Sequence, residues 1–118
     1  MAFGRNSHQT LNKFGAIKTQ VDGITFASRR EANRYLELRM LERAGQITGL
    51  ELQPEFVLLG TFKHAGQTVR GIKYIADFRY FLDGKEIIED SKGHRTKDYL
   101  IKKKLFLFKF PDKTHLET

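Results

Sequence analysis

The sequence has no cysteine and no tryptophan, and only two of its 118 residues are proline. Without cysteine the chain cannot form a disulfide, a thiolate zinc site or a cysteine nucleophile, so a bound metal ion would need oxygen or imidazole ligands. It also lacks an apolar run near the ~20 residues that span a bilayer. Its first ten residues, MAFGRNSHQT, lack the apolar stretch of a secretory signal. We therefore expect a cytoplasmic protein with no membrane partner.

Positive charge is what the sequence has in excess. It contains 21 Lys and Arg residues against 14 Asp and Glu residues, which gives a formal net charge of +7 and an isoelectric point of about 9.8. Such a balance favours polyanionic partners, nucleic acid first. The length fits one domain. We expect a flexible basic N-terminal arm over residues 1–16 and a single domain over residues 17–118.

The first half of the domain shows the signals of a hairpin and a helix. Asp22-Gly23 lies between two short alternating runs in KTQVDGITF, which is typical of a two-residue β-hairpin turn. The stretch SRREANRYLELRMLERAG predicts a helix, with Ser28 as its N-cap and Gly45 as its end. The next apolar stretch, LELQPEFVLL, covers residues 50–59 and reads as one strand, with Pro54 at a sheet edge or a bulge.

The second half begins with a connection and two paired strands. GTFKHAGQTV reads as a connection that turns around Ala65-Gly66. GIKYIADFRYFL then predicts a strand of about ten residues, because it is rich in aromatic and β-branched side chains. Asp83-Gly84 turns this strand into KEIIEDSK, so we expect the two strands to pair in antiparallel fashion.

The chain should end in a helix and a short strand. Thr96 is a possible N-cap and Pro111 a stop, so we predict a helix from about 96 to 109, although LFLFKF also alternates like a strand. A strand near 114–117 follows. The order of elements predicts an α/β fold, with one mixed central sheet and one helix on each face.

Two carboxylates can meet across the predicted antiparallel pair. Counting outward from its turn, Leu82 faces Lys85, and Asp77 then lies opposite Asp90 if no bulge intervenes. Directly opposed side chains have Cβ atoms roughly 4.5–5.5 Å apart, and two like charges there are destabilising. A Mg²⁺ ion would remove the repulsion, because its ligands are carboxylates, waters and phosphate oxygens. Lys92 shares a strand face with Asp90, so it could orient an attacking water or stabilise charge on phosphorus beside the metal ion.

Asp77, followed after twelve residues by Asp90-Ser91-Lys92, resembles the PD-(D/E)XK signature of the restriction-endonuclease-like nucleases, with Ala76 in place of the proline. In that superfamily the two acids bind Mg²⁺ and the lysine serves the hydrolytic water. The resemblance implies these roles for Asp77, Asp90 and Lys92. Glu31, on the preceding helix, resembles an additional acid of many members, which implies a third catalytic and metal-binding side chain.

A wider resemblance covers residues 20–118. The segments VDGITFASRREANRYLEL, LQPEFVLL, YIADFRY, IIEDSKG, TKDYLIKKKLF and FPDKTHLE resemble a family of small phage and prophage proteins of unknown function, which is placed in the same nuclease superfamily. Gln53-Pro54 resembles an element of transposon-end nucleases. The likeness implies a restriction-endonuclease-like core and a phage-type protein in a bacterial host cell.

Several of these residues also have a structural interpretation. Asp90 and Lys92 could form a solvated cross-strand ion pair worth roughly 0–1 kcal/mol, but this leaves Asp77 unexplained. Ser28-x-x-Glu31 is itself a capping box, in which the glutamate returns to the amide of the cap, and both roles could hold. Glu89 alternates with Asp90 along the strand, so it should face away from Asp90 as a surface acid.

Basic residues follow the signature closely. Arg95, Lys97, Lys102 and Lys103 lie on or beside the predicted last helix, where we interpret them as phosphate contacts that supply affinity rather than sequence choice. A solvated helix face is the alternative interpretation. Tyr99 lies on the face of Lys102 and could equally belong to the core.

Together with the resemblance, these residues predict a Mg²⁺-dependent endodeoxyribonuclease, in which Mn²⁺ could substitute and no small-molecule cofactor takes part. A domain this small has little surface for reading a long sequence, so branched or junction DNA is the expected substrate, as for Holliday junction resolvases. Cutting both strands would need two active sites, which favours a homodimer. The alternative is a catalytically silent DNA-binding or assembly module of the same fold, and an RNA substrate also stays open.

Overall fold

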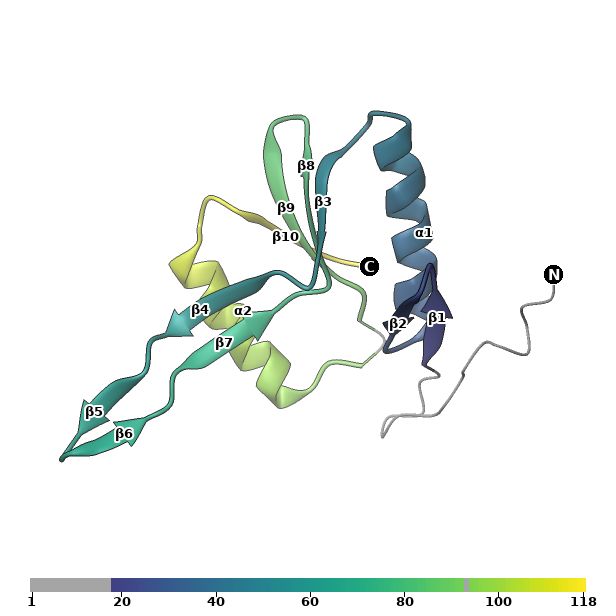
Figure 1. Cartoon of the computed structure of the whole chain (residues 1–118). Coiled ribbons are helices and arrows are strands. Elements are labelled where there is room, and N and C mark those ends of the chain that lie inside the picture. The colour runs from purple at the N-terminus through teal and green to yellow at the C-terminus, as the bar shows by residue number, and fades with distance from the viewer. Residues whose placement is uncertain (1–17, 93) are drawn as a thin grey trace.

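The computed structural model describes residues 18–92 and 94–118, within which the chain forms two helices and ten strands (Figure 1). The predicted basic arm over residues 1–16 lies outside the described residues. The elements are β1 (Thr19–Val21), β2 (Ile24–Phe26), α1 (Arg29–Arg43), β3 (Thr48–Leu52), β4 (Glu55–Leu59), β5 (Phe62–His64), β6 (Gln67–Val69), β7 (Ile72–Ile75), β8 (Phe78–Leu82), β9 (Lys85–Asp90), α2 (Lys97–Lys109) and β10 (Thr114–Glu117). Neither α1 nor α2 has the length and apolar character that crossing a membrane requires.

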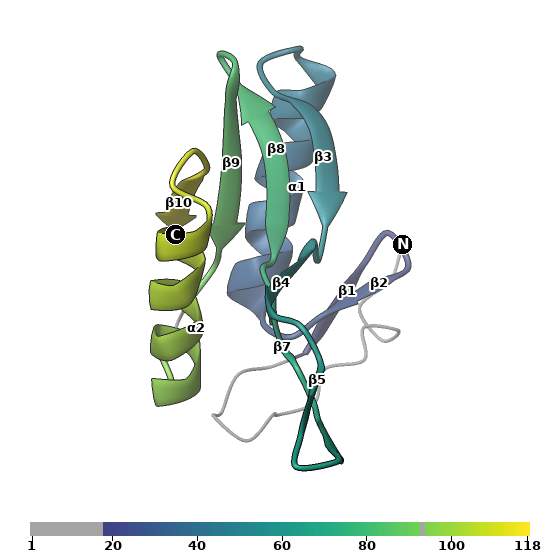
Figure 2. The ribbon, with the colours of Figure 1, turned by 90° about the vertical axis from the view of Figure 1, so that its left-hand side faces the viewer.

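A four-stranded mixed sheet forms the centre of the molecule, in the order β10-β9-β8-β3. Strand β10 runs parallel to β9, while β8 pairs with β9 and with β3 in antiparallel fashion. Consecutive side chains of β9 enter different cores: Ile87 packs with Leu38 of α1, and Ile88 packs with Phe106 of α2. The α/β fold with a mixed central sheet and one helix on each face is therefore confirmed (Figure 2).

Local sequence signals set the ends of both helices. The Ser28 hydroxyl accepts a hydrogen bond from the Glu31 amide (3.1 Å), and the Thr96 hydroxyl accepts one from the Tyr99 amide (3.0 Å). Each contact satisfies a backbone donor that the first helical turn cannot pair. Gly45 follows α1 with a φ of 77°, a backbone conformation that glycine adopts without steric cost. LFLFKF is helical through Lys109, as predicted.

Two stretches predicted as single strands are each broken into two. Residues 50–59 form the end of β3 and all of β4, separated by Gln53 and Pro54, and Gln53 has a φ of 52°. Residues 72–82 likewise form β7 and β8, separated by Ala76 and Asp77. The breaks lie side by side, because the Gln53 amide donates to the Asp77 carbonyl (3.0 Å) and the Ala76 amide donates to the Pro54 carbonyl (3.1 Å). Both strands therefore leave the central sheet at the same point.

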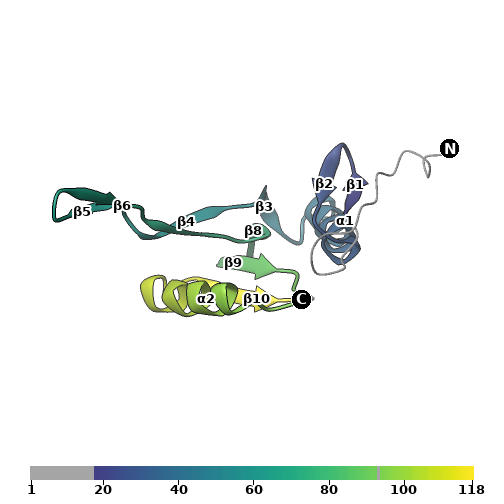
Figure 3. The same cartoon turned by 90° about the horizontal axis from the view of Figure 1, so that it is seen from below.

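Beyond the breaks, the two segments of the chain continue as a projecting two-stranded ribbon, which we call the arm (residues 55–75). Strands β4 and β7 form its base, and the predicted connection is itself a short hairpin, β5 and β6, with its turn at Ala65-Gly66 as expected. Figures 1 and 3 show this hairpin at the end of the arm, away from the central sheet. A side chain at Gly71 would meet the Leu59 carbonyl at 2.1 Å, so the strands come into closest contact at the joint between base and hairpin.

Candidate active site

Asp77 and Asp90 meet where the central sheet and the arm join. The register pairs Leu82 with Lys85 and ends with Phe78 opposite Glu89, as counted from the turn. The Asp77 amide donates both to the Glu89 carbonyl (3.1 Å) and to Asp90 Oδ1 (3.1 Å). Because no bulge interrupts this pair, Asp77, one residue before β8, lies next to Asp90 at the end of β9.

Asp90 is fully buried, and one of its oxygens is held by two aromatic side chains. Asp90 Oδ2 accepts a hydrogen bond from the hydroxyl of Tyr74 and lies 3.4 Å from His115 Nε2. The Tyr74 hydroxyl is also 2.8 Å from His115 Nε2. Burial raises the pKa of Tyr74, so this phenol keeps its proton and remains a donor. Asp90 Oδ1 is left facing Asp77 and Lys92.

Asp77 is held by one oxygen and keeps the other available. Its Oδ2 accepts a hydrogen bond from the Ser91 amide (2.7 Å), and Oδ1 has no hydrogen-bond partner among the residues that the structure describes. Burial, and next the negative charge of Asp90, raise the pKa of Asp77 to about 6, while the bond from Ser91 acts in the opposite direction. The pKa of Asp77 therefore reflects first its burial and then the neighbouring carboxylate of Asp90.

Lys92 lies between the acids and an aromatic ring. Its Nζ is 3.8 Å from Asp90 Oδ1 and 4.5 Å from the centroid of the Tyr99 ring. Tyr99 is itself buried, and its hydroxyl donates to Glu117 (2.5 Å). The solvated ion pair considered from the sequence is therefore not what forms, because Asp90 is buried and the ring packs against the ammonium group.

Glu31 joins this group from the first turn of α1. It is buried, and burial followed by the negative charge of Asp77 raises its pKa to about 7. A hydrogen bond from the Ala27 backbone and the positive charge of Lys92 lower this pKa, and Asp90 raises it. Glu31 thus has a capping contact with the chain before the helix and an electrostatic contact with the acids. Among the described contacts, only half of the predicted capping box forms: the Ser28 hydroxyl accepts from the Glu31 amide, whereas the Glu31 carboxylate bonds the Ala27 backbone in place of the Ser28 amide. The proposed role of Glu31 at a metal site stays a prediction.

The carboxylates of Asp77 and Asp90 are the candidate ligands for a divalent cation. Within residues 18–92 and 94–118, no group of three or more His, Asp or Glu side chains is arranged to hold a metal ion. Mg²⁺, however, is commonly bound through one or two carboxylates, with waters and substrate phosphates completing its octahedron. Asp77 and Asp90 supply such a pair, and Asp77 has an oxygen with no hydrogen-bond partner among the described residues. The pKa values of Asp77 and Glu31 are raised first by burial and further by neighbouring carboxylates, whose charge a cation would offset. The residues present therefore fit Mg²⁺ or Mn²⁺.

Glu89 was predicted to be a surface acid, and this is wrong. It does face away from Asp90, but its side chain is fully buried against α1. Arg34 donates to both of its oxygens (2.5 and 3.0 Å), and the hydroxyls of Tyr80 (2.6 Å) and Thr118 (3.0 Å) complete its contacts. The helical spacing of Glu31 and Arg34, which puts both on the sheet-facing side of α1, was the signal that could have identified the partner.

Of the four predicted phosphate-binding residues, Arg95 lies in the loop before α2, Lys97 begins α2, and Lys102 and Lys103 lie near its middle. Arg95 Nη2 lies 2.8 Å from Glu117 Oε1, and Lys103 Nζ lies 3.0 Å from Glu117 Oε2, so two cations share one carboxylate. Lys102 pairs with Asp98 of the same helix (3.5 Å), and Lys97 is exposed and has no ion pair with another described residue. This side of the molecule thus keeps positive charge next to the acids.

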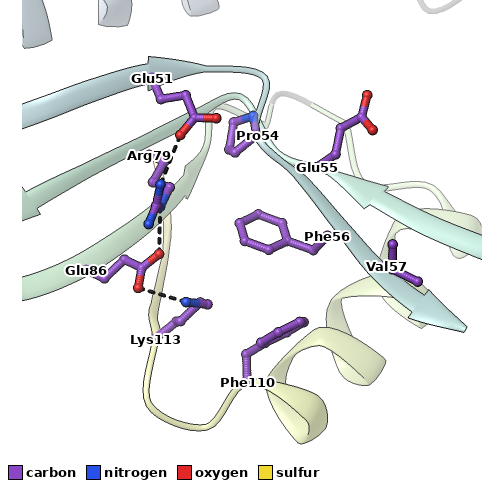
Figure 4. A pocket seen from close by; sticks show the side chains of 9 residues that line it. All are labelled: Glu51, Pro54, Glu55, Phe56, Val57, Arg79, Glu86, Phe110 and Lys113. Atoms are coloured by element: carbon purple, nitrogen blue, oxygen red, sulfur yellow. Dashed lines mark hydrogen bonds and ion pairs between the residues drawn. The ribbon is translucent and has the colours of Figure 1, made fainter.

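A separate pocket of about 390 Å³ lies between the base of the arm and the end of α2 (Figure 4). Phe56 and Phe110 form its apolar side. Arg79 pairs with Glu51 (3.0 Å) and Glu86 (2.6 Å), and Lys113 also pairs with Glu86. None of the predicted site residues lines this pocket, and carboxylates neutralise its cations. We therefore do not assign it to nucleic acid.

Comparisons with known proteins place the chain in a family without assigning an activity. No curated protein and no solved structure matches it. One family model, described as a protein of unknown function, DUF1064, matches residues 11–117, which is nearly the whole chain. The chain therefore belongs to the DUF1064 family.

Proposed function

We propose that this protein is a Mg²⁺-dependent endodeoxyribonuclease of the PD-(D/E)XK superfamily and of phage type. The observation that supports this best is the meeting of Asp77, Asp90 and Lys92 at one point, with Asp90 fully buried, Asp77 half-buried and the lysine Nζ 3.8 Å from Asp90. Two adjacent carboxylates beside one lysine are a combination that metal-assisted hydrolysis of a phosphodiester can use.

Asp77 and Asp90 would hold the metal ion, and Mn²⁺ would be accepted in place of Mg²⁺. When bound, the ion supplies positive charge for the phosphate oxygens and increases the acidity of a bound water. The chain's own residues prepare this site: Tyr74 and His115 fix the orientation of Asp90, and the Ser91 amide fixes that of Asp77. Neither carboxylate has to reorganise when the cation arrives.

Lys92 and Glu31 have complementary roles. The Lys92 ammonium group, held against the Tyr99 ring, would orient the attacking water and stabilise the negative charge that builds on phosphorus. Glu31, with its pKa raised to about 7, would hold a water of the cation and can accept a proton near neutral pH. Catalysis is thus assigned to Asp77, Asp90, Lys92 and Glu31.

The substrate is assigned to DNA from charge and size. Arg95 and Lys103 pair with Glu117, which lies opposite Asp90 in the register of β9 and β10. Together with Lys97 and Lys102 of α2, they would contact phosphates on either side of the scissile bond. Phosphate contacts of this kind do not distinguish base sequence, so recognition of a branched or junction structure is the proposal. A homodimer would place two sites on the two strands.

Cleavage assays on three DNA forms test this assignment. Purified protein is incubated with a labelled four-way junction, a linear duplex and a single strand, each in EDTA, Mg²⁺ or Mn²⁺. We expect scission that needs the cation and that falls at least 100-fold in folded Asp90→Asn and Lys92→Met variants. Lys85→Met is the matched control, because Lys85 is exposed at the far end of the sheet. Cleavage that persists in EDTA, or in both site variants, would contradict the assignment.

The silent DNA-binding module is the competing function. It is favoured by one observation, namely that no group of three ligating side chains is arranged for a metal ion within the described residues. If the protein binds DNA in a salt-dependent way, and no cation induces scission of any of the three substrates, this second function replaces the first.

A further inference from the structure

The arm has a charge pattern that differs from the rest of the chain. Between Glu55 and Asp77 the sequence contains no Asp or Glu, whereas it contains Lys63, Arg70 and Lys73. Lys73 pairs with Glu55 at the base (3.2 Å). Lys63 on β5 and Arg70, which lies at the joint between the hairpin and the base, form no ion pair with any other residue in the part of the chain that the structure describes. The far end of the arm is therefore purely cationic.

The hairpin at the tip has no core of its own. All six residues of β5 and β6 are exposed, including Phe62 (43%) and Val69 (37%), which face each other across the ladder. A lone two-stranded hairpin is at best marginally stable in water. Tight packing at Gly71 nevertheless fixes where it leaves the base. This combination of defined direction and exposed surface leaves the tip open to a partner.

The arm starts at the acids and has the length of one turn of DNA. Asp77 follows the arm after one residue, Ala76. The Asp77 carbonyl accepts from the Gln53 amide, and the Ala76 amide donates to the Pro54 carbonyl, at the point where the arm begins. The eleven residues from Asp77 back to Gly66 span roughly 35 Å when extended. One turn of B-DNA is about 34–36 Å, and its major groove, about 12 Å wide, admits a two-stranded β-ribbon.

We propose that the β5–β6 hairpin is a DNA-contacting element that enters a groove of duplex DNA about one helical turn from the scissile phosphate. Lys63 would contact a phosphate there, Arg70 at the joint would contact one nearer the scissile bond, and Phe62 and Val69 would lie against the sugars. This inference rests on the proposed nuclease function, because it names where the duplex extends from that site. A second copy of the chain fits less well, since pairing two such tips would bring like charges together.

Binding measurements test the charge argument. Affinity for duplexes of 30 and 10 base pairs is measured in EDTA at several salt concentrations. The variant is Lys63→Gln/Arg70→Gln, and the matched control is Arg43→Gln/Lys85→Gln, which removes the same charge at exposed positions at the opposite end of the central sheet (Figure 1). We expect the tip variant to lose about 5- to 50-fold in affinity for the long duplex, with its salt slope reduced by about two. Both variants should behave alike on the short duplex, which cannot reach the tip and the acids together.

Proximity cleavage tests the position directly. The chain has no cysteine, so Gln67→Cys at the tip or Lys85→Cys as control gives a single attachment point for an iron chelate that cuts nearby DNA. In an Asp90→Asn background, the Gln67→Cys conjugate should cut about one turn from the position at which the wild-type protein cuts, and the control should not.

The outcomes separate the two proposals. Length-dependent loss of affinity without any wild-type scission would overturn the nuclease and keep the arm as a DNA contact. If the wild-type protein cuts DNA and the tip and control variants lose affinity equally, the nuclease activity is supported and the DNA contact of the β5–β6 hairpin is overturned. A tip variant that changes only the sedimentation of the protein would show that a second copy covers the hairpin, which also overturns the proposal.

Discussion

Asp90 is the residue on which most of the candidate site converges. Tyr74 comes from β7 and His115 from β10, and both approach the same oxygen of Asp90. Asp77 and Lys92 approach the other oxygen. Such fixed outer contacts orient a ligating carboxylate, and their loss typically weakens metal binding or activity by 10- to 100-fold.

Tyr74→Phe should therefore lower activity and Mg²⁺ affinity by about 10- to 100-fold. It should cost on the order of 1–3 kcal/mol of stability, because a buried carboxylate oxygen loses a donor. Mg²⁺ titration of cleavage rate and urea unfolding are the measurements. Tyr80→Phe is the matched control, since it removes an equally buried phenol hydroxyl from Glu89 instead of Asp90. Equal loss of Mg²⁺ affinity in both variants would contradict a specific role of Tyr74.

Glu31 and Asp77 make a prediction about pH. Their pKa values are raised on folding, to about 7 and about 6, so the folded state binds more protons than the unfolded state between about pH 4 and pH 7. Their contribution to stability is fully present below the unfolded pKa values and is lost as pH rises through the folded ones. In EDTA, Glu31→Gln should therefore be more stable than wild type at pH 8, by roughly 1–3 kcal/mol, and not at pH 4.

Urea unfolding at pH 4, 6 and 8 measures this difference. At pH 8, Mg²⁺ should reduce the difference in free energy of unfolding between Glu31→Gln and wild type, because the cation offsets the charge that this substitution removes. A wild-type protein that gains stability relative to Glu31→Gln between pH 5 and pH 7.5 would show that the sign of the pKa shift is wrong.

Among the elements, α1 and β9 are joined by one buried ion pair. Arg34 binds Glu89 through two hydrogen bonds, and this raises the pKa of Arg34. Because Glu89 immediately precedes Asp90, the pair also fixes the strand that bears the site. Such pairs seldom add net stability over apolar packing, but removing one partner leaves an uncompensated buried charge.

Arg34→Met should accordingly destabilise the protein by about 3–5 kcal/mol, and Arg34→Met/Glu89→Leu should recover most of that loss. Denaturant unfolding gives both values, and Arg43→Met on the exposed end of the same helix provides a control. If the double variant were no more stable than the single one, the loss would come from packing of the arginine stem rather than from the unpaired charge.

At the scale of the whole molecule, Asp90 ends β9 of the central sheet and Asp77 lies in the break between β7 of the arm and β8, so the two acids lie where the sheet and the arm join. One such site can cut one strand. If a homodimer supplies the second active site, sedimentation of the 13.7 kDa chain should give twice this mass at assay concentrations. Both strands of a junction should then be cut in one binding event. A plasmid-borne junction distinguishes paired from single nicks, and a monomer that releases singly nicked product would contradict the dimer.

The sequence alone determined the features that depend on neighbouring residues. Ser28, Thr96 and Gly45 set helix ends through contacts within a few residues. The turn before Lys85 fixed the register of β8 and β9, and because side chains alternate along a strand, that register placed Asp77 beside Asp90.

Only the tertiary structure decided the features that depend on distant contacts. The strands break at Gln53 and Ala76 because backbone bonds between these two places replace the ladder, and neither stretch shows this by itself. Glu89 is buried because Arg34, fifty-five residues earlier, supplies its counter-charge. His115 reaches Asp90 because β10 pairs in parallel with β9, a pairing that joins residues separated by a whole helix. Burial and its electrostatic consequences follow from such contacts, since local periodicity gives the face of a residue but not the partner that covers it.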